Sequence, residues 1–194
     1  MLNGKNNEEK IWRFLKAQGL TDAGAAGLMG NLYAESALSP TNLQNTFEKK
    51  LGYSDAAYTA AVDSGDYDNF VRDSAGFGLA QWTYWTRKRN LLDYAKSRGK
   101  SIGDLEMQLD FLMKELSEGY RAVLTTLKTA ASVRAASDAV LLQFECPADQ
   151  TLAVQAKRAG YGQKYYDKYA GQNPEKGNGI PMSAYTNSPL VTYS

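Results

Sequence analysis

Apolar residues recur every three or four positions along most of the chain, which is the spacing of amphipathic helices. Ile11, Phe14 and Leu15 follow this spacing and precede Gly19, so we expect a first helix that ends near residue 18. The same spacing predicts further helices at residues 21–38, 47–51, 56–62, 83–98, 105–116, 120–127, 132–144 and 151–169. The pattern therefore predicts a mainly helical protein.

The second predicted helix carries an acidic residue near its end, Glu35, at the edge of its apolar face. At about 100° per residue, that face is formed by Ala25, Leu28, Met29, Leu32 and Ser36. A carboxyl group that lies against apolar side chains loses hydration of its charged form, so its pKa rises and it can act as a general acid. The ordinary alternative is a solvated surface glutamate.

Small residues form the opposite face of this helix: Gly24, Gly27, Gly30, Asn31 and Ala34. Glycine costs helix stability, so a whole face of small residues indicates that something comes close to the backbone. A bound ligand and a tight helix crossing both fit this pattern.

A short stretch bounded by glycines, residues 73–83, follows about 40 residues later and is typical of a strand or hairpin. We expect a small β-hairpin that lines a cleft, with a helical bundle packed around the central helix that carries Glu35. An acid on a helix that faces a polar hairpin is an arrangement found in glycosidases.

The chain has 194 residues, which suits one domain of roughly 150 to 170 residues and not two. We expect this domain to span residues 1–170. From Gly171 the sequence loses its apolar periodicity, and residues 171–194 are predicted to be a linker toward a further C-terminal catalytic or binding domain.

The amino-acid composition limits the ligands and catalytic groups that the chain can offer. The 22 basic and 21 acidic residues nearly cancel, which disfavours nucleic-acid binding. With no histidine and one cysteine, a Ser-His-Asp triad, an internal disulfide and the usual zinc sites are excluded, and we expect neither metal nor cofactor. Cys146 follows an apolar run and is interpreted as a buried structural thiol. The carboxyl groups of Asp and Glu remain as the candidate catalytic groups.

No stretch approaches the roughly 20 apolar residues of a membrane span, so no membrane insertion is expected. The polar N-terminal residues do not form a secretory signal. We therefore expect synthesis in the cytoplasm with release by other machinery, or an export signal that lies elsewhere.

Three motifs occur in a characteristic order: Gly27 to Ser36 with its Glu-Ser pair, Gly78 to Trp82, and Phe144 to Pro147. With them the chain resembles the phage tail lysozyme group of the goose-type lysozyme and soluble lytic transglycosylase superfamily. The resemblance covers roughly residues 7–169. It implies a lysozyme-like fold.

The resemblance also implies a substrate and a reaction. The substrate is the peptidoglycan glycan strand, and the bond is the β-1,4 linkage between N-acetylmuramic acid and N-acetylglucosamine, with Glu35 as the acid. Asp73 matches one aspartate of goose-type enzymes, while Thr83 stands where a second is found. If Asp73 acts as base, water attacks in an inverting hydrolysis. Otherwise the substrate's own hydroxyl attacks and leaves an anhydro sugar, as in lytic transglycosylases.

The same resemblance implies a set of substrate-binding residues. Gln81 is expected on the cleft floor as a hydrogen-bond donor, and Trp82 under a sugar or, alternatively, in the core. The remaining candidates are Tyr33, Ser36, Glu145 and Tyr161.

Two functional classes fit the sequence. The first is a peptidoglycan-cleaving glycosidase that acts at the bacterial cell wall, as one module of a phage endolysin or tail-associated lysin. The second is a catalytically silent wall-binding or tail-structural module with the same fold. Glu35 together with Gln81 favours the first.

Overall fold

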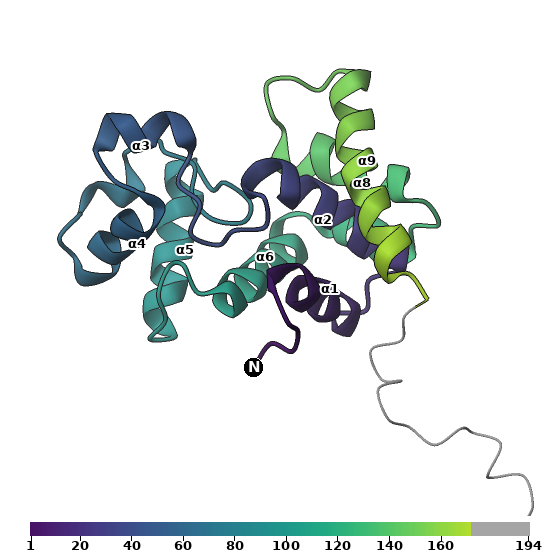
Figure 1. Cartoon of the computed structure of the whole chain (residues 1–194), viewed down its shortest axis with the longest axis horizontal. Helices are drawn as coiled ribbons and strands as arrows, with labels where there is room; N and C mark the ends of the chain where they lie inside the picture. The colour runs from purple at the N-terminus through teal and green to yellow at the C-terminus, as the bar shows by residue number, and fades with distance from the viewer. Residues whose placement is uncertain (172–194) are drawn as a thin grey trace, which may run out of the picture.

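The computed structural model describes residues 1–171 (Figure 1). In chain order its helices are α1 (Asn7–Ala17), α2 (Asp22–Ser36), α3 (Asn45–Leu51), α4 (Asp55–Ser64), the 3-10 helix η1 (Asn69–Val71), α5 (Trp85–Ser97), α6 (Leu105–Gly119), α7 (Arg121–Thr129), α8 (Val133–Val140), the π-helix η2 (Leu141–Glu145) and α9 (Leu152–Tyr169). The predicted mainly helical class is confirmed. No helix in this part of the chain is long and apolar enough to cross a membrane. Apart from Gly171, the predicted linker lies outside the described residues.

Polar side chains begin most of these helices where the sequence places them. Each accepts a hydrogen bond from the backbone N–H three residues later, which satisfies a donor that the first helical turn leaves unpaired. These N-cap residues are Asn6, Thr21, Ser54, Asp104, Ser132 and Thr151. Most observed bounds consequently lie within a few residues of the predicted ones.

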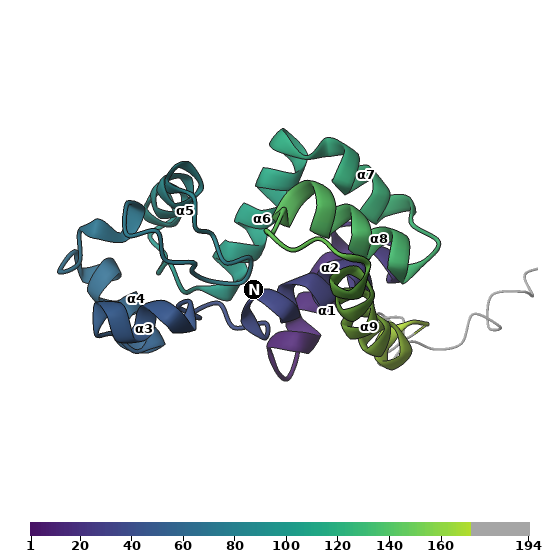
Figure 2. The same ribbon diagram turned by 90° about the horizontal axis from the view of Figure 1, so that it is seen from above.

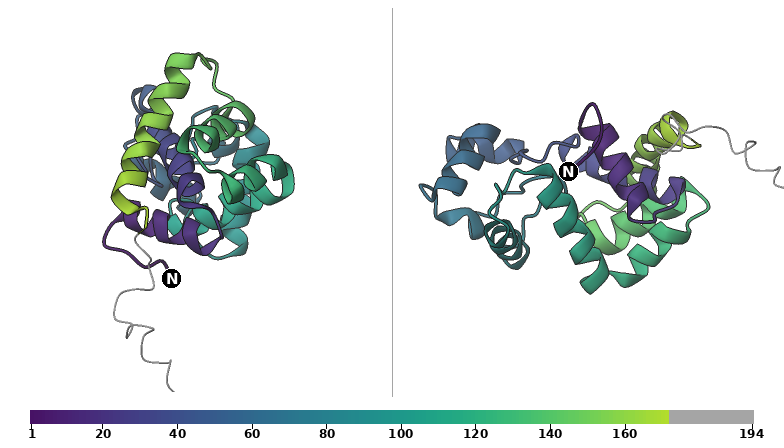
Figure 3. Two further views of the ribbon diagram at one scale, coloured as in Figure 1. Left: turned by 90° about the vertical axis from the view of Figure 1, so that its right-hand side faces the viewer. Right: turned by 90° about the horizontal axis from the view of Figure 1, so that it is seen from below.

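The helices form two groups. In Figures 1 and 2, α3, α4 and α5 gather on one side and α2, α7, α8 and α9 on the other, with α6 running between them. Figure 3 shows α9 lying along the outside of the second group. The chain crosses to the first group after α2 and returns through the segment between α5 and α6, so the end of α2 faces the first group (Figure 1).

Helix α2 is the centre of the second group and is packed by α1, α7, α8 and α9. Its glycines explain how: a Cβ on Gly24 would meet the backbone oxygen of Leu127 at 1.8 Å, and one on Gly30 would meet that of Arg158 at 2.5 Å. Gly27 faces Ala136 in the same way. The small-residue face therefore lets neighbouring helices pack close to α2. Of the two alternatives that fit the sequence, a bound ligand and a tight helix crossing, the structure shows the helix crossing.

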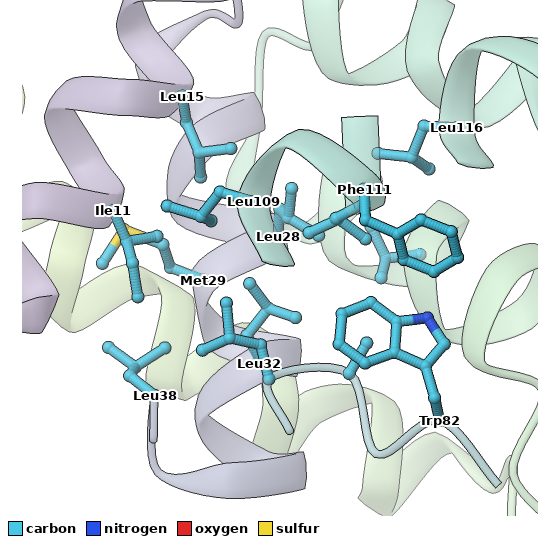
Figure 4. Close-up of a cluster of buried hydrophobic side chains, with 14 of the residues drawn as sticks. Ile11, Leu15, Leu28, Met29, Leu32, Leu38, Trp82, Leu109, Phe111 and Leu116 are labelled. Atoms are coloured by element: carbon cyan, nitrogen blue, oxygen red, sulfur yellow. The ribbon is translucent and has the colours of Figure 1, made fainter. Parts of the chain in front are cut away.

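The core lies where α1, α2 and α6 meet the segment that precedes α5 (Figure 4). Leu28 and Leu32 of α2 are fully buried there, and Trp82 packs edge-on against Phe111 at 5.5 Å between ring centroids. This core fixes the end of α2 relative to residues 78–82.

The predicted β-hairpin is not confirmed. Within the described residues, only isolated bridges join Phe77 to Leu43 and to Trp82. Gly78 and Gln81 have positive φ values of 75° and 47° and form a tight turn that Phe77 and Trp82 close with two backbone hydrogen bonds, but the pairing does not extend beyond this one bridge into strands. The turn still occupies the place that the hairpin was expected to take.

Candidate active site

A cleft of about 760 Å³ opens between the two helix groups, where α2 ends. Its lining comes from the end of α2, the loop before α3 and the start of α3, the turn after Gly78, α5 and the end of η2. The lining residues are Tyr33, Ala34, Glu35, Ser36, Ala37, Asn42, Gln44, Asn45, Thr46, Ala80, Gln81, Thr83, Tyr84, Arg87, Glu145 and Pro147. Five of the sequence-predicted site residues thus share one cleft.

Glu35 is held at the cleft by the way α2 ends. Ala37 and Leu38 adopt left-handed backbone conformations with φ of 51° and 63°, which ends the helix at Ser36, one residue after Glu35. The Ser36 hydroxyl donates to the carbonyl of Leu79 at 2.9 Å and ties this helix end to the turn. The Glu35 side chain is 19% exposed, so its carboxyl group reaches the cleft without lying in bulk solvent.

Arg158 of α9 is the charged partner of Glu35. Its Nη2 lies 2.5 Å from Glu35 Oε1, and its Nη1 donates to Oδ1 of Asn31 at 3.3 Å. The Asn31 amide in turn donates to the backbone oxygen of Gly27 and to the Ser137 hydroxyl, at 3.0 Å each. A buried chain of polar contacts from α8 and α9 therefore orients the Glu35 carboxylate.

Glu145 contributes a second carboxyl group to the cleft. It is the last residue of η2, and the left-handed Cys146, with φ of 45°, turns the chain immediately after it. Its Oε1 is buried and accepts no hydrogen bond from any described residue. Burial, followed by the charge of Glu35, raises the pKa of Glu145 to about 8, against the opposing effect of Arg87 and Arg158.

Arg87 connects this carboxyl group to the wall of the cleft. It forms a two-pronged ion pair with Glu115 of α6, with N–O distances of 2.9 and 2.8 Å, and its guanidinium lies 4.7 Å from the centre of the Phe144 ring. Arg87 acts on the Glu145 carboxyl group through its charge, while the Oε1 atom of Glu145 accepts no hydrogen bond from the described residues.

Gln81 lies on the cleft floor, but its amide donors are used within the protein. Nε2 donates to the backbone oxygen and to Oδ1 of Asn42, at 3.0 and 2.9 Å, and to the carbonyl of Gly78 at 3.2 Å. The residue therefore fixes the turn against the loop before α3, and its role as donor to substrate stays a prediction.

A family model described as phage tail lysozyme matches residues 6–169. The chain belongs to this family. The resemblance inferred from the three motifs is thereby confirmed, and the match spans the domain from α1 to α9. Membership of the phage tail lysozyme family supports a lysozyme-like glycosidase function and implies peptidoglycan as the substrate.

Asp73 does not line this lysozyme cleft. Its side chain is fully buried, and its carboxylate accepts from Lys88 Nζ and from the Tyr58 hydroxyl, both at 2.5 Å, and from the Tyr67 hydroxyl at 3.2 Å. A carboxylate with four oxygen–donor contacts, including the Ala75 amide at 2.9 Å, has no free position for a catalytic water. The structure therefore does not bring Asp73 and Glu35 together as an acid and base pair.

Trp82 also departs from the expected sugar contact. Its ring is fully buried, and its Nε1 donates to Glu115 Oε2 at 2.7 Å. No face of the ring is available to a sugar, so the alternative of core packing holds.

Tyr33 is 41% exposed and lines the cleft. Tyr161 packs edge-on against it, with 4.8 Å between ring centroids, and lines an adjoining hollow of about 300 Å³ beside α9. Tyr161 is thus a neighbour of the cleft and not part of its lining.

Arg158 and Arg87 are the site residues that the sequence reading missed. Neither belongs to a motif, and only the tertiary fold brings them to the two glutamates.

Cys146, expected to be buried, is exposed, and its thiol donates to the Leu142 carbonyl. Among residues 1–171, no group of three or more Cys, Asp or Glu side chains is placed to hold a metal ion.

Proposed function

We propose that the chain cleaves peptidoglycan glycan strands at the β-1,4 bond between N-acetylmuramic acid and N-acetylglucosamine, with Glu35 as the general acid. The observation that carries this proposal is the pair of carboxyl groups, Glu35 and Glu145, on the lining of one cleft in a member of the phage tail lysozyme family. Glycoside cleavage needs carboxyl groups of unequal proton affinity in one site.

Glu35 and Glu145 lie in different electrostatic surroundings. Glu35 faces the Arg158 guanidinium, whereas Glu145 has a buried oxygen with no partner among the described residues. An unpaired carboxylate is costly to bury, so Glu145 keeps its proton at neutral pH. Glu145 is therefore the proton store of the cleft, and Glu35 is the group that the helix end aims at the substrate.

The reaction follows from this division. Glu35 receives the proton from Glu145 and passes it to the glycosidic oxygen as the bond to the anomeric carbon breaks, and the bonding electron pair stays on that oxygen. Water, or a hydroxyl group of the same sugar, then forms the new bond to the anomeric carbon. The proton that this nucleophile loses returns to the carboxyl pair. Asp73 takes no part in these steps.

The site of action in this proposal is the bacterial cell wall. Tyr33 offers an exposed ring at the cleft edge, suited to the apolar face of a sugar. Asn42, Gln44 and Thr46 supply polar groups on the opposite lining. A cleft with an aromatic edge and polar lining groups suits a polymer rich in hydroxyl and acetamide groups.

Digestion of purified cell walls tests the proposal. The parent protein is expected to release soluble muropeptides and Glu35→Gln to release none above background, as measured by mass spectrometry. Glu118→Gln, an exposed residue of α6 outside the cleft, is the matched control and should behave as the parent.

The ends of the released fragments distinguish the two nucleophiles. Reducing ends identify attack by water, and anhydro ends identify attack by the sugar's own hydroxyl. If the folded parent binds walls but releases no fragments, the chain is a catalytically silent binding or tail-structural module and the proposal is wrong.

A further inference from the structure

A second hollow of about 410 Å³ adjoins the cleft on the side of α5. Its lining residues are Val71, Arg72, Ser74, Thr83, Tyr84 and Trp85. Thr83 and Tyr84 also line the cleft, so the two depressions share a wall. A polymer that lies in the cleft and continues past Tyr84 therefore enters this hollow.

The hollow is edged by two large aromatic side chains that the fold leaves uncovered. Tyr84 is 64% exposed and Trp85 is 52% exposed, and their ring centroids are 6.2 Å apart with the planes tilted by 43°. Neither ring is needed for the core, which Trp82 and Phe111 fill. Exposed neighbouring aromatic rings are typical of binding surfaces, because each ring offers a flat apolar face beside a polar tip.

A buried ion pair holds the two segments that line the hollow, residues 71–74 and the first turn of α5, in place relative to each other. The Asp73 carboxylate lies between Val71 and Ser74 in the chain and accepts from Lys88 Nζ at 2.5 Å, and Lys88 Nζ also donates to the Ala75 carbonyl at 2.7 Å. Lys88 stands one helical turn after Tyr84, to whose carbonyl its backbone N–H donates at 2.9 Å. The buried ion pair thus joins residues 71–75 to the first turn of α5 and keeps the hollow formed without a ligand.

Arg72 adds a cation to the hollow. Its side chain is exposed, and no ion pair joins it to any of residues 1–171. A guanidinium donates to acetamide oxygens and to carboxylates alike. Two aromatic faces and one cation suit a polymer that alternates N-acetylated sugars with sugars bearing carboxylate-containing substituents.

We propose that the hollow is a further subsite for the peptidoglycan glycan strand, beyond the cleft in which the bond is cleaved. This inference rests on the proposed function for the identity of the polymer. Trp85 stacks on a sugar of the continuing strand, Tyr84 covers the passage between cleft and hollow, and Arg72 pairs with an acetamide or a carboxylate. The protein consequently prefers long strands to short oligosaccharides.

The test compares Trp85→Ala with the parent on long, purified glycan strands and on short peptidoglycan oligosaccharides. We expect the rise in KM on long strands to exceed the rise on short oligosaccharides by about tenfold, the size of one lost ring contact. Leu152→Ala is the control, since Leu152 is 75% exposed on α9 and lines neither depression. Equal changes on both substrates, or changes no larger than those of Leu152→Ala, would overturn the subsite.

A binding measurement separates this inference from the proposed function. Glu35→Gln and Glu35→Gln/Trp85→Ala are compared for retention on intact purified walls, where no cleavage occurs. Weaker retention of the double variant supports the subsite even if the parent proves to be catalytically silent, and equal retention contradicts it. Circular dichroism and thermal unfolding establish that both variants are folded.

Discussion

The guanidinium of Arg158 lies 2.5 Å from the Oε1 atom of Glu35, although the two residues belong to helices at opposite ends of the domain sequence. The other guanidinium nitrogen reaches Asn31, which lies one helical turn before Glu35 on α2. The planar guanidinium group contacts two residues of the same helix, and this fixes the direction of the Glu35 side chain.

This geometry predicts that Arg158→Lys lowers activity although the charge is kept. An ammonium group is a single point charge and cannot reach both partners, so the Glu35 carboxyl group loses its fixed position. Because small misplacements of a catalytic group are costly, we expect wall cleavage to slow by about 10²-fold. The measurement is the rate of muropeptide release per folded molecule.

Lys157→Arg is the matched control for this change, because Lys157 is the exposed neighbour of Arg158 on α9. It should cleave walls at the parental rate. Parental rates for Arg158→Lys would mean that the ion pair does not position Glu35.

The sequence predicts the helices well because the signals that form them are local. Capping side chains such as Thr21 and Asp104 lie within three residues of the amides that they satisfy. Gly24, Gly27 and Gly30 indicate that something comes close to α2, but only the structure shows that neighbouring helices do so. The position of Glu35 at the end of α2 follows from the same local pattern.

The remainder of the site depends on contacts between distant segments. Asp73 fits a catalytic aspartate by position in the chain, and only the fold reveals Lys88 beneath it. Glu145 stands at the end of a π-helix, which the 3.6-residue period does not predict, so the sequence gives no sign of the burial of its carboxyl group. No pattern in the sequence pairs Arg87 or Arg158 with a glutamate.

Asp73→Asn is predicted to reduce stability and not the chemistry of cleavage. The substitution leaves the Lys88 charge fully buried without its partner, a change that costs about 3–5 kcal/mol in other buried pairs. Urea unfolding measures the loss. Below the unfolding transition, wall cleavage per folded molecule should not fall by the orders of magnitude expected for the loss of a catalytic group.

Two further variants check this interpretation. Asp68→Asn removes an exposed aspartate close by and should leave the free energy of unfolding unchanged. Asp73→Asn combined with Lys88→Met removes both charges and should cost less than Asp73→Asn alone. A folded Asp73→Asn that cleaves walls orders of magnitude more slowly would return Asp73 to the mechanism.

Gly30→Ala is predicted to destabilise the protein and to displace the site. The new Cβ would lie 2.5 Å from the backbone oxygen of Arg158 and from the backbone nitrogen of Gly162, so α9 must move away from α2. Overpacking of this kind costs about 1–3 kcal/mol or more. Because Arg158 moves with α9, activity per folded molecule should fall as well.

Gly160→Ala, on the same helix, is the control. A Cβ at Gly160 meets no atom within 4 Å, so the substitution should be neutral or stabilise the helix by up to about 1 kcal/mol. Thermal unfolding of the two variants side by side measures the difference. Similar melting temperatures would contradict the crossing of α2 and α9.

Glu145→Gln is predicted to change how stability depends on pH. The pKa of Glu145 is raised from 4.5 to about 8 in the folded protein, so between these values the folded state holds a proton that the unfolded state releases. Its contribution to stability is therefore complete at about pH 4 and is lost as the pH rises through about 8, with a slope of up to about 1.4 kcal/mol per pH unit. Glutamine does not titrate, so the variant should lack this loss.

Urea unfolding from about pH 5 to about pH 8 measures the difference between parent and variant. Stability of the parent should fall relative to Glu145→Gln across this range, while Glu118→Gln, which removes an exposed carboxylate of α6, should follow the parent.

The same proton supplies the proposed reaction, so wall cleavage by the parent should decline as the pH rises through about 8, with the pKa of Glu145. In Glu145→Gln the proton store is gone, and we expect cleavage to be slower and to lack the decline that follows the pKa of Glu145. If the parent and Glu145→Gln share one activity profile and one stability profile, Glu145 does not hold the proton, and the division of roles between the two glutamates is incorrect.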